Sequence, residues 1–253
     1  MITDLLIYGA GGFGREIACL IKAINIVNAQ WNLIGFIDDG IEPGENNRYG
    51  TVLGGLSFLN SYPKNIAVVF SIASPSILQK LVSSINNSLV SFPNIIAPNV
   101  NIFDPDAFSA GKGNVMFFGC RVSCDVQIGD FNLFNGFVSL GHDVTMGSYN
   151  VLGPSTRVSG NTTVGDSNFF GVQSIVLQGL KIGDQTRIGP NSVVIRNTNN
   201  NSLYYGNPAN RVRKAVEKSC VSSRSLSAES ETTLRYEVSS PYENNTLARA
   251  MLA

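Results

Sequence analysis

The amino-acid sequence predicts an α/β domain of the Rossmann-like type, followed by a parallel β-helix built from hexapeptide repeats. Two observations support this order. An apolar run enters a glycine-rich loop at residue 9, and an amphipathic segment follows that loop. From residue 110 to residue 194, every sixth residue is apolar. Because the two periodicities differ, we expect the chain of 253 residues to contain two differently built units.

Composition restricts the classes of function. Eighteen basic and 18 acidic residues give zero formal net charge, which disfavours nucleic-acid binding, and 43% apolar residues suffice for a core. The four cysteines form no CxxC pair, so we expect reduced thiols rather than a zinc site. His142 is the only histidine, so a histidine-rich metal site is excluded and we expect no metal. The N-terminus has the pattern of a strand rather than a signal peptide, and no run is long enough for a membrane span, which predicts a cytoplasmic protein.

The N-terminal unit begins with an apolar run at residues 4–8, which we expect to form a strand. It leads into Gly9-Ala10-Gly11-Gly12-Phe13-Gly14, and apolar residues at helical spacing follow up to Ile24. Strand, G-x-G-x-x-G and helix is the context of the dinucleotide-binding fingerprint, in which the glycines and the helix N-terminus accommodate a pyrophosphate. The alternative is that these glycines only make a tight turn.

Two further units complete the N-terminal domain. The apolar run 33–37 ends in Asp38-Asp39, where carboxylates can accept hydrogen bonds from a ribose hydroxyl or a base edge. A third strand is predicted at 66–72 and a helix at 75–85. We therefore predict a Rossmann-like nucleotide-sugar-binding domain at residues 1–92. Its predicted contacts are listed as Gly11, Gly12, Phe13, Gly14, Asp38 and Asp39.

The hexapeptide repeat is the strongest signal in the chain. If about 45% of positions are apolar, fifteen apolar residues in a row would arise on the order of once in a hundred thousand trials. They are Ala110, Met116, Val122, Ile128, Phe134, Leu140, Met146, Leu152, Val158, Val164, Phe170, Val176, Ile182, Ile188 and Val194. Each is expected to point inward and to stack on its equivalent one coil away, while the frequent glycine after it turns the corner. The β-helix is predicted over residues 93–213.

Residues 214–253 are polar and rich in serine, without either periodicity. We expect a disordered or loosely attached tail, in which residues 247–252 could form a short helix.

Together, the hexapeptides, the segment YGAGGFGREIA and the FIDD pair resemble the bacterial hexapeptide-repeat sugar acetyltransferases of the PglD and NeuD type over residues 3–213. The resemblance implies that the β-helix is left-handed. It also implies a homotrimer that binds acetyl-CoA in the cleft between neighbouring β-helices, and a role in surface polysaccharide or glycan synthesis.

His142 and Asp143 are the expected catalytic residues. A neutral imidazole can accept the proton of an attacking amine, and a carboxylate can hold its tautomer. The resemblance implies this role for a histidine followed by an acidic residue. Adjacent residues of a strand point to opposite faces, so the pair must lie at a corner of the coil, or another carboxylate serves His142. The alternative is an ordinary surface histidine.

The resemblance implies further contacts. Asn135 matches the family's asparagine near the substrate amine, although it could instead serve a corner of the coil. The residues expected to contact acetyl-CoA are Val151, Gly160, Gln178 and Gly179. Val151 stands where relatives often carry a second histidine, so one polar contact to the cofactor is lost. Phe13 stands where relatives carry a histidine, so contacts to the sugar are expected to differ. Basic residues that could meet the phosphates, or be ordinary surface charge, are Arg196, Arg211, Arg213 and Lys214.

The expected function is acetyl-CoA-dependent N-acetylation of the amino group of a nucleotide-linked 4-amino deoxysugar, with His142 as general base. O-acetylation of a sialic acid or similar sugar is the nearest alternative. A non-catalytic nucleotide-binding scaffold and an NAD-dependent oxidoreductase are more distant ones. The sequence leaves open whether the nucleotide is UDP, dTDP, GDP or CMP.

Overall fold

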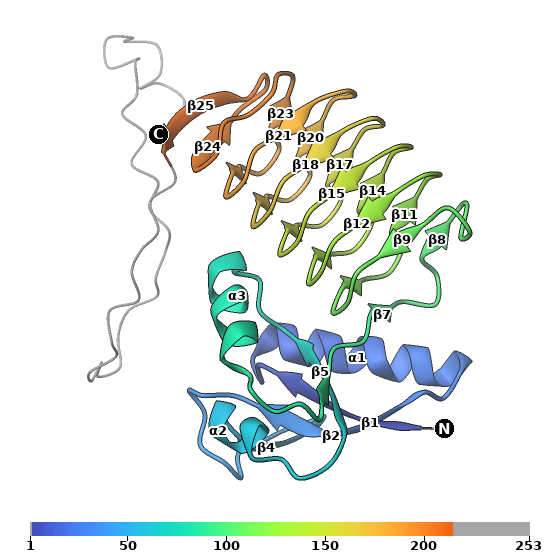
Figure 1. Cartoon of the computed structure of the whole chain (residues 1–253), viewed down its shortest axis with the longest axis vertical. Helices are drawn as coiled ribbons and strands as arrows, with labels where there is room; N and C mark the ends of the chain where they lie inside the picture. The colour runs from blue at the N-terminus through green and yellow to red at the C-terminus, as the bar shows by residue number, and fades with distance from the viewer. Residues whose placement is uncertain (1, 215–253) are drawn as a thin grey trace, which may run out of the picture. The chain divides into compact units, whose positions relative to one another are not determined.

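The computed structural model describes residues 2–214. The predicted tail after Lys214, which includes Cys220, lies outside the described residues. The N-terminal part is a six-stranded sheet in the order β3-β4-β2-β1-β5-β6 with three helices (Figure 1). The bounds are β1 Thr3–Tyr8, α1 Gly12–Val27, β2 Trp31–Ile37, β3 Asn46–Asn47, β4 Gly50–Gly54, α2 Leu56–Asn60, β5 Ile66–Phe70, α3 Pro75–Ser84 and β6 Val90–Ser91.

The predicted α/β character is confirmed. Strand β1 lies between β2 and β5, and both pair with it in parallel. Helix α1 buries the apolar residues that the helical spacing indicated, from Ile17 to Ile24. Helix α3 begins with Pro75, which suits the first turn because the missing N–H would have no partner there.

The β-helix is also confirmed. Its coils consist of two-residue strands that pair in parallel and form three sheets; only the longer β24 and β25 at the end of the first sheet pair antiparallel (Figure 1). The first sheet contains β7 Ile95–Ile96, β10 Val115–Met116, β13 Leu133–Phe134, β16 Val151–Leu152, β19 Phe169–Phe170 and β22 Arg187–Ile188, with β24 Ser202–Tyr205 and β25 Asn210–Lys214 at its end. The second contains β8 Asn101–Ile102, β11 Arg121–Val122, β14 Ser139–Leu140, β17 Arg157–Val158, β20 Ile175–Val176 and β23 Val193–Val194. The third contains β9 Ser109–Ala110, β12 Gln127–Ile128, β15 Thr145–Met146, β18 Thr163–Val164 and β21 Lys181–Ile182.

The periodic apolar residues form the core of the coil. Phe134 pairs with Leu152 in the next coil, which is the predicted stacking at eighteen residues. Every member of the series is buried except Ala110, which is exposed because β9 is the edge strand of the third sheet.

The corner glycines have a different role from the one expected. The residues with positive φ are mainly not glycine; Asp143 (φ 57°) and Tyr149 (φ 60°) are examples. The glycines after the apolar positions allow successive coils to approach closely. A Cβ on Gly171, for example, would lie 2.5 Å from the backbone nitrogen of Pro190. Glycine is therefore required here by packing rather than by backbone conformation.

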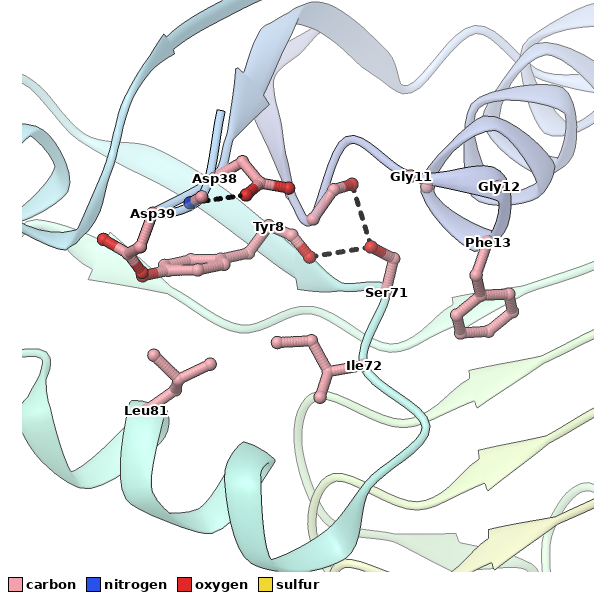
Figure 2. Close-up of a pocket in the computed structure, with 12 residues that line it drawn as sticks. Tyr8, Gly11, Gly12, Phe13, Asp38, Asp39, Ser71, Ile72 and Leu81 are labelled. Carbon is pink, nitrogen blue, oxygen red and sulfur yellow. Dashed lines mark hydrogen bonds between the residues drawn. The ribbon is translucent and has the colours of Figure 1, made fainter. Parts of the chain in front are cut away.

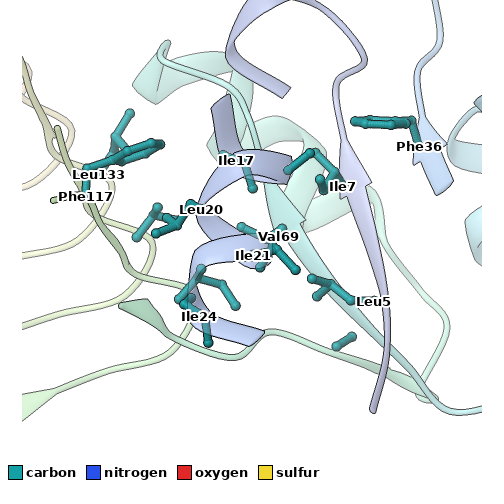
Figure 3. Close-up of a cluster of buried hydrophobic side chains, with 14 of the residues drawn as sticks. Leu5, Ile7, Ile17, Leu20, Ile21, Ile24, Phe36, Val69, Phe117 and Leu133 are labelled. Atoms are coloured by element: carbon teal, nitrogen blue, oxygen red, sulfur yellow. The ribbon is translucent and has the colours of Figure 1, made fainter. Parts of the chain in front are cut away.

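The α/β domain packs on the outer face of the first sheet. The buried face of α1 belongs to the same hydrophobic cluster as Val115, Leu133 and Val151 of the β-helix. Figure 3 shows Phe117 and Leu133 of the β-helix with the α1 side chains of this cluster. The Phe13 and Phe117 rings stack with centroids 5.7 Å apart, and the Phe131 ring lies 5.2 Å from that of Phe92 and 6.0 Å from that of Phe70. The two parts thus form one compact unit.

Candidate functional site

A pocket of about 400 Å³ opens at the carboxyl ends of β1, β2 and β5 (Figure 2). Its lining is Tyr8, Gly9, Gly11, Gly12, Phe13, Gly14, Asp38, Asp39, Gly40, Ser71, Ile72 and Leu81. The structure therefore brings together in one pocket all six residues that the sequence predicted as nucleotide contacts in this domain. Ligands of open parallel sheets bind at this edge, next to the point where the strand order reverses, here between β1 and β5.

The glycines of the loop fall into two groups. A Cβ on Gly9 would overlap the Ser71 hydroxyl, and one on Gly14 would overlap the Gly9 carbonyl oxygen. Those two are required by the tight turn. A Cβ on Gly11 would meet nothing within 4 Å, and one on Gly12 would meet only the Arg15 guanidinium at 3.8 Å. The turn alone does not require glycine at positions 11 and 12. Because these two residues have no side chain, their backbone is open to the pocket.

The two carboxylates hold the loops around the pocket. Asp38 accepts hydrogen bonds from the N–H groups of Ala10 and Gly40, both at 2.9 Å. Asp39 accepts hydrogen bonds from the Leu56 N–H at 2.7 Å and from the Tyr8 hydroxyl. Each carboxylate oxygen keeps a further lone pair for a ligand.

Sequence reasoning placed Gly9 in the loop motif but not among the contacts, and it missed Tyr8, Gly40, Ser71, Ile72 and Leu81 of this lining. Tyr8 ends β1 and Ser71 directly follows β5. The rule that sites form at the carboxyl ends of parallel strands would have found both. Burial, with a smaller contribution from the Asp39 carboxylate, raises the pKa of Tyr8, so its hydroxyl stays protonated and donates.

His142 and Asp143 form a pair on the β-helix. His142 Nδ1 lies 2.7 Å from Asp143 Oδ2, and the two side chains are 49% and 58% exposed. The pair lies in the turn between β14 of the second sheet and β15 of the third. The positive φ of Asp143 (57°) breaks the alternation of a strand, so two adjacent side chains can meet.

His142 belongs to a column of turn residues that we call the second–third corner, because it connects the second sheet to the third. The Asp143 N–H donates to the Cys124 carbonyl, the Asn161 N–H to the His142 carbonyl, and the Gly179 N–H to the Gly160 carbonyl. A Cβ on Gly160 would lie 2.5 Å from His142 Nε2, so the imidazole lies directly against this glycine. Of the residues expected to contact acetyl-CoA, Gly160, Gln178 and Gly179 share this column.

Two expected site residues lie elsewhere. Val151 is 3% exposed in the cluster beneath α1, so its side chain does not reach the surface in the described chain. Asn135 lies in the turn between β13 and β14, the first–second corner, and its Oδ1 accepts a hydrogen bond from the Gly136 N–H at 2.7 Å. Within one coil, Asn135 and His142 thus occupy different corners of the triangle.

The same geometry separates the pocket from the imidazole. Phe117 at the first–second corner stacks on Phe13, and Phe131 at the third–first corner contacts Phe70. The α/β domain therefore covers the first sheet between these two corners. The second–third corner, with His142, is the corner opposite that sheet.

Within residues 2–214, no cluster of three or more histidine, cysteine or acidic side chains could hold a metal ion. Over the same residues, no helix has the length and apolar character needed to cross a membrane.

Comparisons with known proteins agree with this architecture. A profile of the PglD N-terminal domain matches residues 4–85, whereas no curated protein matches the chain. The structure is similar to WeeI from Acinetobacter baumannii AYE (26% identity, 83% of this chain and 100% of that one, TM-score 0.74). It is also similar to PerB from Caulobacter crescentus, in complex with CoA and GDP-perosamine (25%, 84% and 98%, 0.72). A third match is the acetyltransferase domain of PglB from Neisseria gonorrhoeae FA1090, in complex with acetyl coenzyme A (23%, 84% and 100%, 0.75). Residues 4–85 thus match the PglD N-terminal domain, and the chain as a whole has the fold of PglD-type sugar acetyltransferases with a left-handed β-helix, as the resemblance in the sequence predicted.

Proposed function

We propose that this protein transfers the acetyl group of acetyl-CoA to the amino group of a nucleotide-linked 4-amino deoxysugar, in the cytoplasm, for surface polysaccharide or glycan synthesis. The observation that carries the proposal is the His142–Asp143 pair, held at an exposed corner against Gly160. The PerB structure, which contains CoA and GDP-perosamine, and the WeeI structure support it through their shared fold.

In the proposed reaction, His142 acts as the general base. Asp143 accepts the hydrogen bond from Nδ1–H, which leaves the lone pair of Nε2 free. The sugar amine attacks the thioester carbonyl carbon as Nε2 takes its proton. The C–S bond then breaks, and the coenzyme A thiolate leaves and is protonated. Asp143 stabilises the imidazolium that forms.

The second–third corner supplies the proposed path for acetyl-CoA. From His142 the column continues through Gly160 and Gln178-Gly179 to Arg196. At about 4.8 Å per coil, Arg196 lies about 14 Å from His142 along the column. A thioester at His142 would therefore place the phosphates of the cofactor towards this cation.

We further propose that the active site is completed in a homotrimer. The nucleotide pocket and Asn135 lie on one side of the triangle, and His142 lies at the opposite corner. A sugar held in the pocket of one chain would then meet His142 of a neighbouring copy.

The activity is tested with the purified protein, acetyl-CoA and a 4-amino sugar nucleotide, by following thiol release. His142→Ala should lower the rate about 10² to 10⁴-fold, as for a lost general base, without altering the assembly. Unchanged turnover in this variant, or acetylation of free sialic acid in place of the amino sugar, would contradict the proposal.

The composite site is tested by mixing two inactive variants. A phenylalanine at Gly11 meets no protein atom near its Cβ, so Gly11→Phe should block the pocket while leaving the fold intact. If the site spans two copies, co-expression of Gly11→Phe with His142→Ala should restore activity, because some sites receive an intact pocket and an intact imidazole. If each chain works alone, the mixture stays inactive.

A further inference from the structure

The polar side chains of the pocket share one property: none has a proton to offer a ligand. The Tyr8 hydroxyl donates to Asp39, and the single proton of the Ser71 hydroxyl is shared between the carbonyl oxygens of Tyr8 and Gly9, at 2.8 and 2.9 Å. Ionised Asp38 and Asp39 only accept hydrogen bonds. Together these four residues form what we call the acceptor end of the pocket (Figure 2).

The available donors lie at the other end. The N–H groups of Gly9, Ala10 and Gly40 are already engaged, with Ile37 and Asp38 as acceptors. The N–H groups of residues 11–14 open helix α1 and have no acceptor among the described residues, as usual for a first helical turn. We call these four groups the amide end.

A nucleoside diphosphate sugar matches this division. Its pyrophosphate suits the amide end, where N–H groups and the helix dipole favour negative charge. Its nucleoside must then bind at the acceptor end through its own donors. Asp38 directly follows β2, the position from which a carboxylate contacts ribose hydroxyls. Asp39 is left for the base, beside the apolar side chains of Ile72 and Leu81 that face the same part of the pocket (Figure 2).

The bases differ in what they present to such a carboxylate. Guanine carries two adjacent donors, N1–H and the 2-amino group, which match the two oxygens of one carboxylate. Uracil and thymine place their single N–H between two carbonyl oxygens, and the amino groups of cytosine and adenine adjoin a ring nitrogen that accepts. Each of these would set an acceptor against the acceptor end.

We propose that the pocket selects a guanine nucleotide, so that the substrate is a GDP-linked amino sugar. This inference rests on the proposed function, because it assigns the nucleotide of the same site. Asp39 is its specificity-determining residue, and Tyr8 is a positioning residue that fixes the Asp39 carboxylate.

The test is calorimetric titration of the whole chain with GDP, IDP, UDP and dTDP. IDP lacks only the 2-amino group, so it should bind at least ~10-fold more weakly than GDP. UDP and dTDP should bind at least ~100-fold more weakly, because they set carbonyl oxygens against the acceptor end and leave Asp39 with one donor instead of two. Binding of IDP equal to that of GDP, or of UDP or dTDP as tight as that of GDP, would overturn the inference.

Two variants locate the effect. Asp39→Asn should reduce the ratio of GDP to IDP affinity towards one, whereas Tyr8→Phe, which keeps the carboxylate, should weaken both nucleotides alike; an unchanged ratio in Asp39→Asn overturns the assignment of Asp39. The acetyl-transfer assay separates the two proposals. Acetylation of a UDP-linked amino sugar with tight UDP binding would sink the guanine inference alone, and selective GDP binding without any acetyl transfer would sink the proposed function alone.

Discussion

Replacement of Gly160 by alanine tests whether the position of the His142 ring matters to the reaction. The added Cβ would lie 2.5 Å from Nε2 and 2.7 Å from Cδ2 and Cε1 of the ring. The Gly160 backbone lies outside the left-handed region, so alanine adds no strain there and the ring must give way. It must move by about 1 Å to reach an ordinary contact of about 3.5 Å. A misplacement of that size can cost about 10²-fold in rate, so we expect kcat to fall by about that factor.

The assay compares acetyl transfer by Gly160→Ala in two backgrounds, with thermal melts to verify folding. In the wild-type background kcat should fall, whereas in His142→Ala the same change should leave the residual rate unaltered, because the clashing ring is gone. A similar fall in both backgrounds would show that the methyl group acts on the cofactor rather than on the imidazole. Full activity of Gly160→Ala would refute the role of the ring position altogether.

Three further predictions concern the pocket, the domain contact and the core. Gly12→Ala should change the free energy of unfolding by less than about 0.5 kcal/mol, yet it should raise the KM for the sugar nucleotide at least ~10-fold. Gly14→Ala should instead destabilise the fold, because its Cβ would overlap the Gly9 carbonyl oxygen. Equal melting temperatures of the two variants in a thermal scan would contradict this. Phe131→Ala should lower the free energy of unfolding, measured with denaturant, by about 3–5 kcal/mol, because Phe131 is 2% exposed between the α/β domain and the β-helix. A loss below about 1 kcal/mol would contradict that packing. Burial raises the pKa of Cys120 to about 11 from 9.0, so the thiol stays neutral in the folded state over a range in which it ionises in the unfolded chain. The stability that this contributes, about 3 kcal/mol, is fully present below pH 9 and is lost as the pH rises from 9 to 11. Cys120→Ala should lack this part of the pH dependence, and identical stability curves would refute it.

The parts of the fold that could be predicted are those in which one residue type recurs at the spacing of one element. The inward positions of the coil recur every six residues, and the buried face of α1 recurs at helical spacing, so both are visible in the sequence. The contact between domains is not. Phe131 and Tyr149 occupy corner positions that in an isolated β-helix would face solvent, and only the partner residues Phe70 and Phe92 explain why they are aromatic.

The candidate site was predictable to a similar degree. The glycine loop and Asp38-Asp39 are adjacent in sequence to strands, so their convergence follows from the parallel sheet. Tyr8 and Ser71 belong to no sequence motif. Their importance lies in the acceptors to which their hydroxyl groups donate, and these acceptors depend on atomic positions. The contact between His142 and Asp143 likewise depends on the positive φ of Asp143, which residue types alone do not specify.

The exposure of the His142–Asp143 pair gives a physical reason why the proposed active site needs a second copy. Both side chains are about half exposed in one chain, and water screens the interaction of an exposed carboxylate with its neighbours. A base of this kind works best where water is excluded, since electrostatic interactions strengthen as the local dielectric falls. The α/β domain cannot cover this corner, because the aromatic contacts at Phe117 and Phe131 hold it on the opposite sheet. In the proposed homotrimer, the neighbouring copy would both deliver the sugar and remove water from the imidazole. The mixed-variant experiment therefore tests the environment of the base as well as the origin of the substrate.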